Sequence, residues 1–174
     1  MTRPVISRVI YMGFMLATLA ACTVPIGGAQ SANAKGCQAG AAKGASPDGL
    51  DQITLCITSG KKTRTFIVEN ARTSLQQEKG LMFRTKLADN AGMIFPFPDV
   101  RRASFWMKNT VIPLDIIFIR ANGTIESIAE NAIPYSTDPM SSGEPVTAVL
   151  ELRGGLTGEL GIGPGDKIKW KAKN

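Results

Sequence analysis

Short apolar runs rich in β-branched and aromatic residues recur along the chain from residue 50 onward, separated by turn-forming residues. Runs of this length, bounded by Gly, Pro, Asn, Asp or Ser, are typical of β-strands. The pattern predicts strands at 53–57, 65–68, 92–97, 103–108, on both sides of Asn122-Gly123, at 146–152 and at 167–171.

Helical patterning is confined to two short stretches. Thr73 is a good capping residue before SLQQEK, and Gly80 is a natural stop. Residues 154–161 fit a single helical turn. About eight strands with so little helix predict a mainly β, compact single-domain fold, a β-sandwich or barrel-like structure with one or two short helices. The prolines at 96 and 98 predict that strand 92–97 is short or lies at an edge.

The strongest local signal is Asn122-Gly123 between two β-rich runs. This dipeptide favours a two-residue hairpin loop, because both residues tolerate positive φ. In that register Asp115 lies directly opposite Glu130, and opposed Cβ atoms are about 5 Å apart. Two carboxylates so placed require a cation, a shared proton or a solvent gap.

Three explanations of this carboxylate pair stay open. Lys108, Arg84 or a hard metal such as Ca²⁺ can supply the cation. A shared proton would suit acid–base catalysis by Asp115 and Glu130. Alternatively, a bulge or a frayed strand end separates the two carboxyls.

The first residues have the form of an export signal. Arg3 and Arg8 precede an apolar run, 9–21, that is shorter than the roughly 20 residues needed to span a bilayer. The run ends in Leu-Ala-Ala-Cys22, which resembles the lipobox of bacterial lipoproteins and implies lipidation of Cys22 and attachment to a membrane. Cleavage after Ala34, giving a free periplasmic protein, is the alternative.

The expected organisation is a signal peptide at 1–21, a flexible tether at 22–49 and a β-rich domain at 50–174. The residues of the tether are mostly small or polar, and Gly and Ala are frequent among them. Cys37 and Cys56 then remain as an even pair, which an oxidising compartment would bridge; two free thiols are the alternative.

The amino-acid composition excludes several classes of catalytic and metal site. The chain has no histidine, which excludes Ser-His-Asp and Cys-His nucleophile systems and histidine-containing metal sites. The formal charge of +6 is spread along the chain, and its short basic stretches accompany no nucleic-acid-binding module. No nucleotide loop, haem motif or Cys-x-x-Cys pair is present, so no cofactor and no metal site are predicted.

Five blocks along the chain resemble the domain-of-unknown-function 192 family, also called uncharacterised protein family 0127. They are 80–84 (GLMFR), 92–95 (GMIF), 105–110 (FWMKNT), 112–115 (IPLD) and 165–166 (GD). The resemblance covers about residues 53–171 in order. It implies a compact β-rich domain, often exported in bacteria, and it implies no reaction.

The FWMKNT block holds the leading site candidates. Strand alternation places Phe105 and Met107 in the core and Trp106 and Lys108 on the opposite face. Trp106 beside Lys108 suits a sugar or an anionic ligand, and Asn109 stands at the strand end. The alternative is that Trp106 packs under a loop while Lys108 covers it.

Two further residues have open roles. Arg84 can grip a carboxylate or phosphate with its planar guanidinium, or it can form a structural ion pair with Asp89 or Asp115. Glu151, within Val-Leu-Glu-Leu, faces either a sheet surface or a pocket.

The leading functional hypothesis is a lipid-anchored or periplasmic binding module for a small anionic or saccharide-like ligand of the cell envelope. A histidine-free hydrolase or lyase using Asp115 and Glu130, and a structural partner that docks by a β edge, are the alternatives. The predicted ligand-binding residues are Arg84, Trp106, Lys108, Asn109 and Asp115.

Overall fold

The computed structural model describes residues 37–171. The predicted signal peptide and the first part of the predicted tether lie outside this range. No helix among the described residues is both long enough and apolar enough to cross a membrane.

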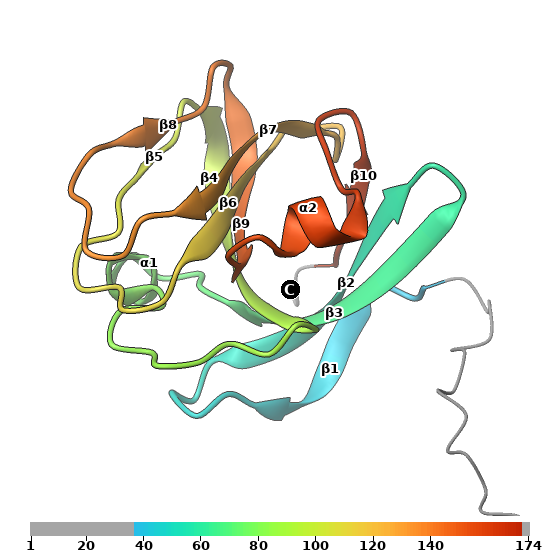
Figure 1. The fold of residues 1–174 in the computed structure, drawn as a ribbon. Helices are drawn as coiled ribbons and strands as arrows, with labels where there is room; N and C mark the ends of the chain where they lie inside the picture. Colours follow the sequence, from blue (N-terminus) through green and yellow to red (C-terminus); the bar gives the residue numbers. More distant parts are fainter. Residues whose placement is uncertain (1–36, 172–174) are drawn as a thin grey trace, which may run out of the picture. The chain divides into compact units, whose positions relative to one another are not determined.

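The described residues form one mainly β domain with two short helices, as predicted (Figure 1). The strands are β1 (Gly40–Ala45), β2 (Asp51–Ser59), β3 (Lys62–Asn70), β4 (Ala91–Arg101), β5 (Ser104–Phe105), β6 (Leu114–Ile119), β7 (Ile125–Ala132), β8 (Met140–Ser141), β9 (Val146–Arg153) and β10 (Lys167–Lys169). The helices are α1 (Ser74–Lys79) and α2 (Leu156–Leu160).

Eight of these strands build one mixed sheet in the order β1-β2-β3-β4-β9-β6-β7, with β10 paired to β2 beside β1. β3 and β4 are parallel, and α1 lies in the connection between them. β5 and β8 form a separate two-stranded sheet. The main sheet is open rather than a closed barrel, although a single bridge between Thr124 and Lys167 links the start of β7 to β10.

Two hydrophobic cores lie on opposite faces of the central strands. Ile94, Ile117 and Leu150 face one core, which also receives Leu156 of α2. Phe95 and Phe118 face the other core, which is completed by loops around α1 and β5. Burial on both faces explains why β6 is buried along its whole length and, apart from Asp115, is apolar instead of alternating.

Helix α1 forms as the sequence predicts. Thr73 Oγ1 accepts from the Gln76 backbone N–H at 3.2 Å, and Gln76 Oε1 accepts from the Thr73 N–H at 3.0 Å. This reciprocal pair is a capping box, which satisfies donors that have no partner within the helix. Gly80, at φ 48°, ends the helix.

The predicted position of β4 at an edge is wrong. β4 has eleven residues and lies between β3 and β9. Its pairing with β3 ends at Ile94, and its ladder with β9 is irregular between Pro96 and Arg101. Both prolines therefore follow the part of β4 that is paired on both sides. Their lack of a backbone N–H does not interrupt the pairing with two neighbouring strands.

The β6–β7 turn also differs from the prediction. The Arg120 N–H donates to the Thr124 carbonyl at 2.9 Å, so the loop has three residues and not two. Gly123, at φ 75°, takes the left-handed position that such a loop requires.

The strands begin earlier in the chain than the sequence pattern indicated. Within the segment predicted as a tether, Gly40–Ala45 forms β1 on the edge of β2. The predicted disulfide between Cys37 and Cys56 is present, with a Cα–Cα separation of 5.9 Å. Cys56 lies in β2, so the bridge holds the chain just before β1 against the strand with which β1 pairs.

Candidate functional site

A cavity of about 630 Å³ opens between α1 and the segment that follows β5. α1 and the three residues after it form one side, and β4 with residues 104–110 forms the other. Glu151 of β9 also borders the cavity. The lining residues are Leu75, Gln77, Glu78, Lys79, Gly80, Leu81, Met82, Phe95, Phe97, Arg101, Ser104, Phe105, Trp106, Lys108, Asn109, Thr110 and Glu151.

Four aromatic side chains give the cavity an apolar wall. Phe95 and Phe105 meet edge to face, with ring centroids 5.1 Å apart. Phe97 is buried, whereas Trp106 is 53% exposed. A large indole left half in solvent at a cavity rim is available to cover a bound molecule.

Three cationic side chains also line the cavity. Lys108 Nζ lies 5.4 Å from the centre of the Trp106 ring, and the Arg101 guanidinium lies 4.1 Å from the centre of the Phe97 ring. Lys79 lies 2.9 Å from Asp48. Cations held over ring faces are stabilised by the ring quadrupole while their outer sides stay free for an anion.

The segment that carries Trp106 and Lys108 is mostly a loop rather than the predicted strand. β5 stops at Phe105, and a turn follows in which the Thr110 N–H donates to the Met107 carbonyl at 3.0 Å. Asn109 adopts φ 57°, and its carbonyl accepts from the Phe83 N–H at 2.9 Å. The predicted facing is nevertheless correct: Met107 is buried, and Trp106 is exposed.

Glu151 is the residue whose importance the sequence did not decide. It lies in β9, opposite Met93 of β4 and Ile116 of β6, and it is only 5% exposed. Among the described residues no hydrogen-bond partner reaches its Oε2. Burial raises the pKa of this carboxyl to about 8, so it is mainly protonated at neutral pH. The sequence feature that could have marked Glu151 as a candidate site residue was its position inside an otherwise apolar run.

Arg84 does not line the cavity. Its guanidinium lies 2.5 Å from Asp48 and 2.9 Å from Glu69, so it forms a structural ion-pair cluster. The predicted partners, Asp89 and Asp115, are wrong. Asp48 lies far earlier in the chain, and no local pattern marks that pairing.

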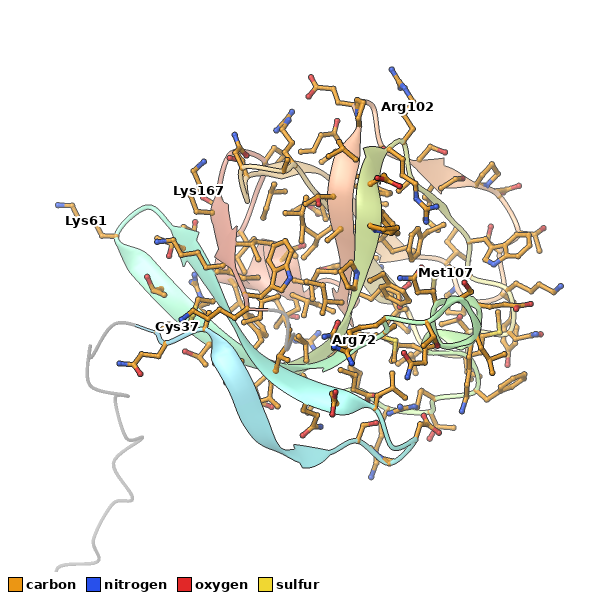
Figure 2. All side chains as sticks on the ribbon, turned by 180° about the vertical axis from the view of Figure 1, so that it is seen from behind. Cys37, Lys61, Arg72, Arg102, Met107 and Lys167 are labelled. Atoms are coloured by element: carbon orange, nitrogen blue, oxygen red, sulfur yellow. A yellow bond between two sulfur atoms is a disulfide. The ribbon has the colours of Figure 1, made fainter. Side chains whose placement is uncertain are left out.

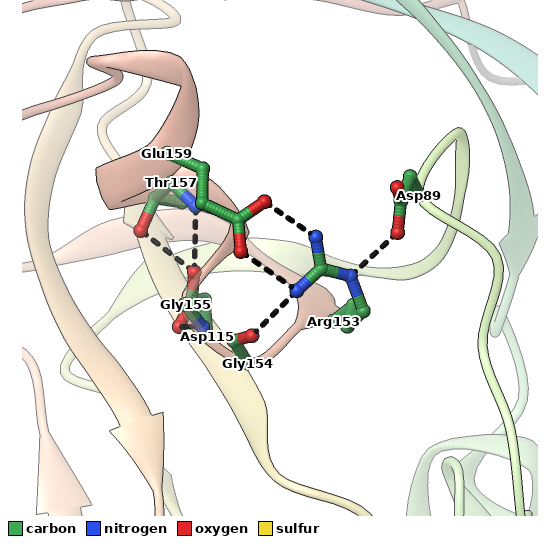
Figure 3. A network of polar contacts seen from close by, with 7 residues as sticks. All are labelled: Asp89, Asp115, Arg153, Gly154, Gly155, Thr157 and Glu159. Atoms are coloured by element: carbon green, nitrogen blue, oxygen red, sulfur yellow. Dashed lines mark hydrogen bonds and ion pairs between the residues drawn. The ribbon is translucent and has the colours of Figure 1, made fainter.

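Asp115 is likewise a structural residue and does not line the cavity. Its contacts with Gly155 and Thr157 are drawn in Figure 3. It is completely buried, and its Oδ1 accepts from the backbone N–H groups of Asn131 and Gly155. Its Oδ2 accepts from the N–H and the hydroxyl of Thr157, at 2.8 and 2.7 Å. Asp115 thereby anchors the first turn of α2 to β6.

Asp115 and Glu130 are not directly opposed across β6 and β7. β6 and β7 are in register at Ile116 and Ala129, but the next paired residues are Leu114 and Ala132. The bulge that the sequence left open as an alternative is therefore present. Glu130 is exposed, whereas Asp115 is enclosed by its four donors.

Of the predicted site residues, the structure brings Trp106, Lys108 and Asn109 to one cavity, and it places Arg84, Asp115 and Glu130 elsewhere. No group of three or more Cys, Asp or Glu side chains that could hold a metal ion occurs among residues 37–171.

Comparison with known proteins gives the same assignment as the sequence blocks. Residues 55–170 match the family DUF192, described as "Uncharacterized ACR, COG1430". The chain belongs to this family. The match spans every block noted in the sequence as well as the cavity, the Asp115 anchor and β10. No curated protein matches the chain.

Two solved structures have the same fold as this DUF192 protein. A protein of unknown function from Novosphingobium aromaticivorans DSM 12444 is 48% identical, with a TM-score of 0.73, covering 75% of this chain and 94% of that one. A Sinorhizobium meliloti 1021 protein, named a "putative transcription regulator", is 40% identical, with a TM-score of 0.67 and coverage of 69% and 94%. Neither name supplies a reaction.

Proposed function

We propose that this DUF192 protein is an exported binding protein that takes a small anionic ligand with a planar apolar body into the cavity beside α1. The observation that carries the proposal is the pairing of Lys108 with the half-exposed ring of Trp106 on a cavity with an aromatic wall.

The apolar body is inferred from the lining. Phe95, Phe97, Phe105 and Trp106 offer ring faces and edges, and the volume of about 630 Å³ lies within the usual range for small-molecule sites. A planar molecule can stack on such rings with little loss of conformational entropy. A saccharide is less well matched, because its hydroxyl groups would be desolvated against phenylalanine side chains.

The negative charge is inferred from the cations. Arg101 and Lys108 line the cavity together with Lys79, whose charge is paired with Asp48, against Glu78 as an exposed carboxylate. The charges near the opening therefore favour an anionic group on the part of the ligand nearest to solvent. The carboxylate-dependent enzyme has no comparable support, because Asp115 and Glu130 share no cleft.

Calorimetric titration with 2-naphthoate tests this proposal. We expect Lys108→Ala to weaken binding severalfold, in a salt-dependent way, and Trp106→Ala to weaken it about tenfold. Lys61→Ala is the matched control, because Lys61 lies at the tip of the β2–β3 hairpin. It is far from Met107, which lies in the loop between Trp106 and Lys108 (Figure 2). The absence of binding by the unmodified protein would overturn the proposal.

Export and membrane attachment are proposed from the sequence alone. The apolar run before Cys22 and the lipobox-like Leu-Ala-Ala-Cys support lipidation at that thiol. Cells fed radioactive palmitate should label the chain, and Cys22→Ser should abolish the label, whereas Cys37→Ser should keep it. A labelled Cys22→Ser variant would contradict lipidation at this residue.

A further inference from the structure

The cavity contains a second recognition element, distinct from its aromatic wall and its cations. Glu151 is buried in the middle of the sheet, between β4 and β6, and borders the cavity. Its Oε2 has no hydrogen-bond partner among the described residues. Unpartnered buried polar atoms are rare in folded proteins and commonly mark a site that something else completes.

The chemistry of this carboxyl depends on its proton. Burial raises its pKa to about 8, and no nearby charge contributes to that shift. A protonated carboxyl has one O–H donor and keeps acceptor capacity on its oxygens. At neutral pH Glu151 therefore presents a proton donor to the cavity that it borders.

We propose that Glu151 is the specificity group of the cavity, donating a hydrogen bond to a carbonyl oxygen at the inserted end of the ligand. This inference rests on the proposed binding function and narrows the ligand class. The ligand would be an aromatic anion that carries an acyl group, or another carbonyl, at the end opposite its charge.

The positions of the charged groups decide between a carbonyl and other partners. Lys108 and Arg101 are exposed, whereas Glu151 is buried, so an anion is best held near the opening and a neutral group at the inner end. If the ligand placed a second charged group beside Glu151, that group would lose its hydration, and this loss would be costly. A carbonyl oxygen is a strong neutral acceptor and leaves no donor of its own unpaired.

The other titratable groups of the cavity do not interfere with this assignment. They are Glu78 and Lys79 of α1, Arg101 of β4 and Lys108 of the loop. None of them is a histidine, the side chain whose charge ordinarily changes near neutral pH. The chain has no histidine, and Cys37 and Cys56 are bridged.

Two matched probes test the proposal on the full-length chain. 4-Acetylbenzoate has a carboxylate and, opposite to it, a carbonyl; 4-isopropylbenzoate has the same shape but no carbonyl. Calorimetry at pH 7 should show that the acetyl compound binds at least tenfold more tightly. Its affinity should fall about tenfold between pH 7 and pH 9, as a carboxyl with a pKa of about 8 loses its proton.

Variants of Glu151 separate hydrogen bonding from packing. Glu151→Gln keeps an N–H donor at every pH, so it should retain the preference for 4-acetylbenzoate and lose the pH dependence. Glu151→Leu should bind the two probes equally. Circular dichroism checks that each variant is folded, and the comparison of the two probes on the unmodified protein does not depend on any variant.

The outcomes distinguish this inference from the function on which it rests. If neither probe binds, the proposed binding function fails and the inference fails with it. If both bind with equal affinity, the binding function stands and the role of Glu151 is refuted. Affinity that rises from pH 7 to pH 9 would also refute it, because the ionised carboxylate would then be the recognition group.

Discussion

Two buried acids in the central sheet show how local surroundings decide the role of a residue. Asp115 and Glu151 lie on neighbouring strands, and both have less than a tenth of their surface exposed. Asp115 is enclosed by four donors, which provide hydrogen bonds to both of its carboxyl oxygens. Within residues 37–171, Glu151 Oε2 has no hydrogen-bond partner, and burial keeps the carboxyl mainly neutral at pH 7. The first is therefore part of the framework, and the second is available for a ligand.

Asp115→Ala should strongly destabilise the domain. The change leaves three backbone N–H groups and the Thr157 hydroxyl without their acceptor, and unsatisfied buried donors cost about 1–3 kcal/mol each. We expect the free energy of unfolding in urea to fall by about 3 kcal/mol or more. Asp89→Ala is the control: it removes one exposed ion pair with Arg153 and should cost less than about 1 kcal/mol. Equal losses would contradict the anchoring role.

Glu151→Gln should change how stability depends on pH. Between the ordinary pKa of 4.5 and about 8, the folded state holds a proton that the unfolded state has released. The free energy of unfolding of the unmodified protein should therefore fall as pH rises through this range, by on the order of 5 kcal/mol in total. Urea titrations at pH 5, 7 and 9 should show this fall, and Glu151→Gln should lack it.

The control for this experiment is Glu130→Gln, which neutralises an exposed carboxyl and should keep the dependence of the unmodified protein. Below about pH 4.5 the opposite slope is expected. Hydrogen bonds from basic side chains lower the pKa values of Asp48, Glu144 and Glu159, so their stabilising contributions are lost on acidification. A stability that does not vary between pH 5 and 9 would show that Glu151 is ionised in the folded state.

At the scale of elements, local signals were predictable and long-range pairings were not. Thr73, Gln76 and Gly80 lie within eight residues, so the capping box and the end of α1 follow from sequence. The three-residue turn at Gly123 could not be predicted from the local sequence, because contact with β10 also fixes its conformation. A Cβ at that position would lie 2.6 Å from the Ile168 carbonyl oxygen. Residues 40–45 lack apolar side chains beyond alanine, so nothing local indicated a strand there.

The wall of the cavity depends on how α1 is attached to the sheet. None of the helical residues is buried, so apolar packing contributes little to its position. Gln77 Nε2 donates to the carbonyls of Ala71 and Pro96, at 3.0 and 2.9 Å. This one side chain thus ties the helix to the end of β3 and to β4.

Gln77→Met should loosen α1 while leaving the sheet intact. The side chain keeps its length but loses both donors, and two lost hydrogen bonds cost about 1–3 kcal/mol. Hydrogen exchange should accelerate at the amides of residues 74–79, with little change in β6 and β9. Gln38→Met, outside the helix, should leave exchange in α1 unchanged. Exchange that rises uniformly over the domain would show that Gln77 supports global stability instead.

At the scale of the molecule, the candidate site was only partly readable from the sequence. Trp106, Lys108 and Asn109 were found together because they are neighbours in the chain. Glu151 lies about 45 residues after Trp106 and reaches the same cavity only through the pairing of β9 with β4, which no short pattern reveals. Arg84 was placed in the site for its chemistry, and its actual partners, Asp48 and Glu69, are brought together only by the fold.

The disulfide is attached to β2, the strand with which both β1 and β10 pair. β1 and β10 both pair with β2 on the side away from β3, and Cys37 is joined to Cys56 of β2. The bridge spans 19 residues, and restricting a loop of that size in the unfolded chain stabilises a fold by about 3 kcal/mol.

Reduction with dithiothreitol should therefore lower the free energy of unfolding by about that amount, measured in urea with and without the reductant. Hydrogen exchange should increase most in β1, because the reduced chain can release that strand while β2 stays paired with β3. Cys37→Ser should behave like the reduced protein and should be insensitive to dithiothreitol. If reduction leaves both stability and the exchange of β1 unchanged, strand pairing alone holds this part of the chain.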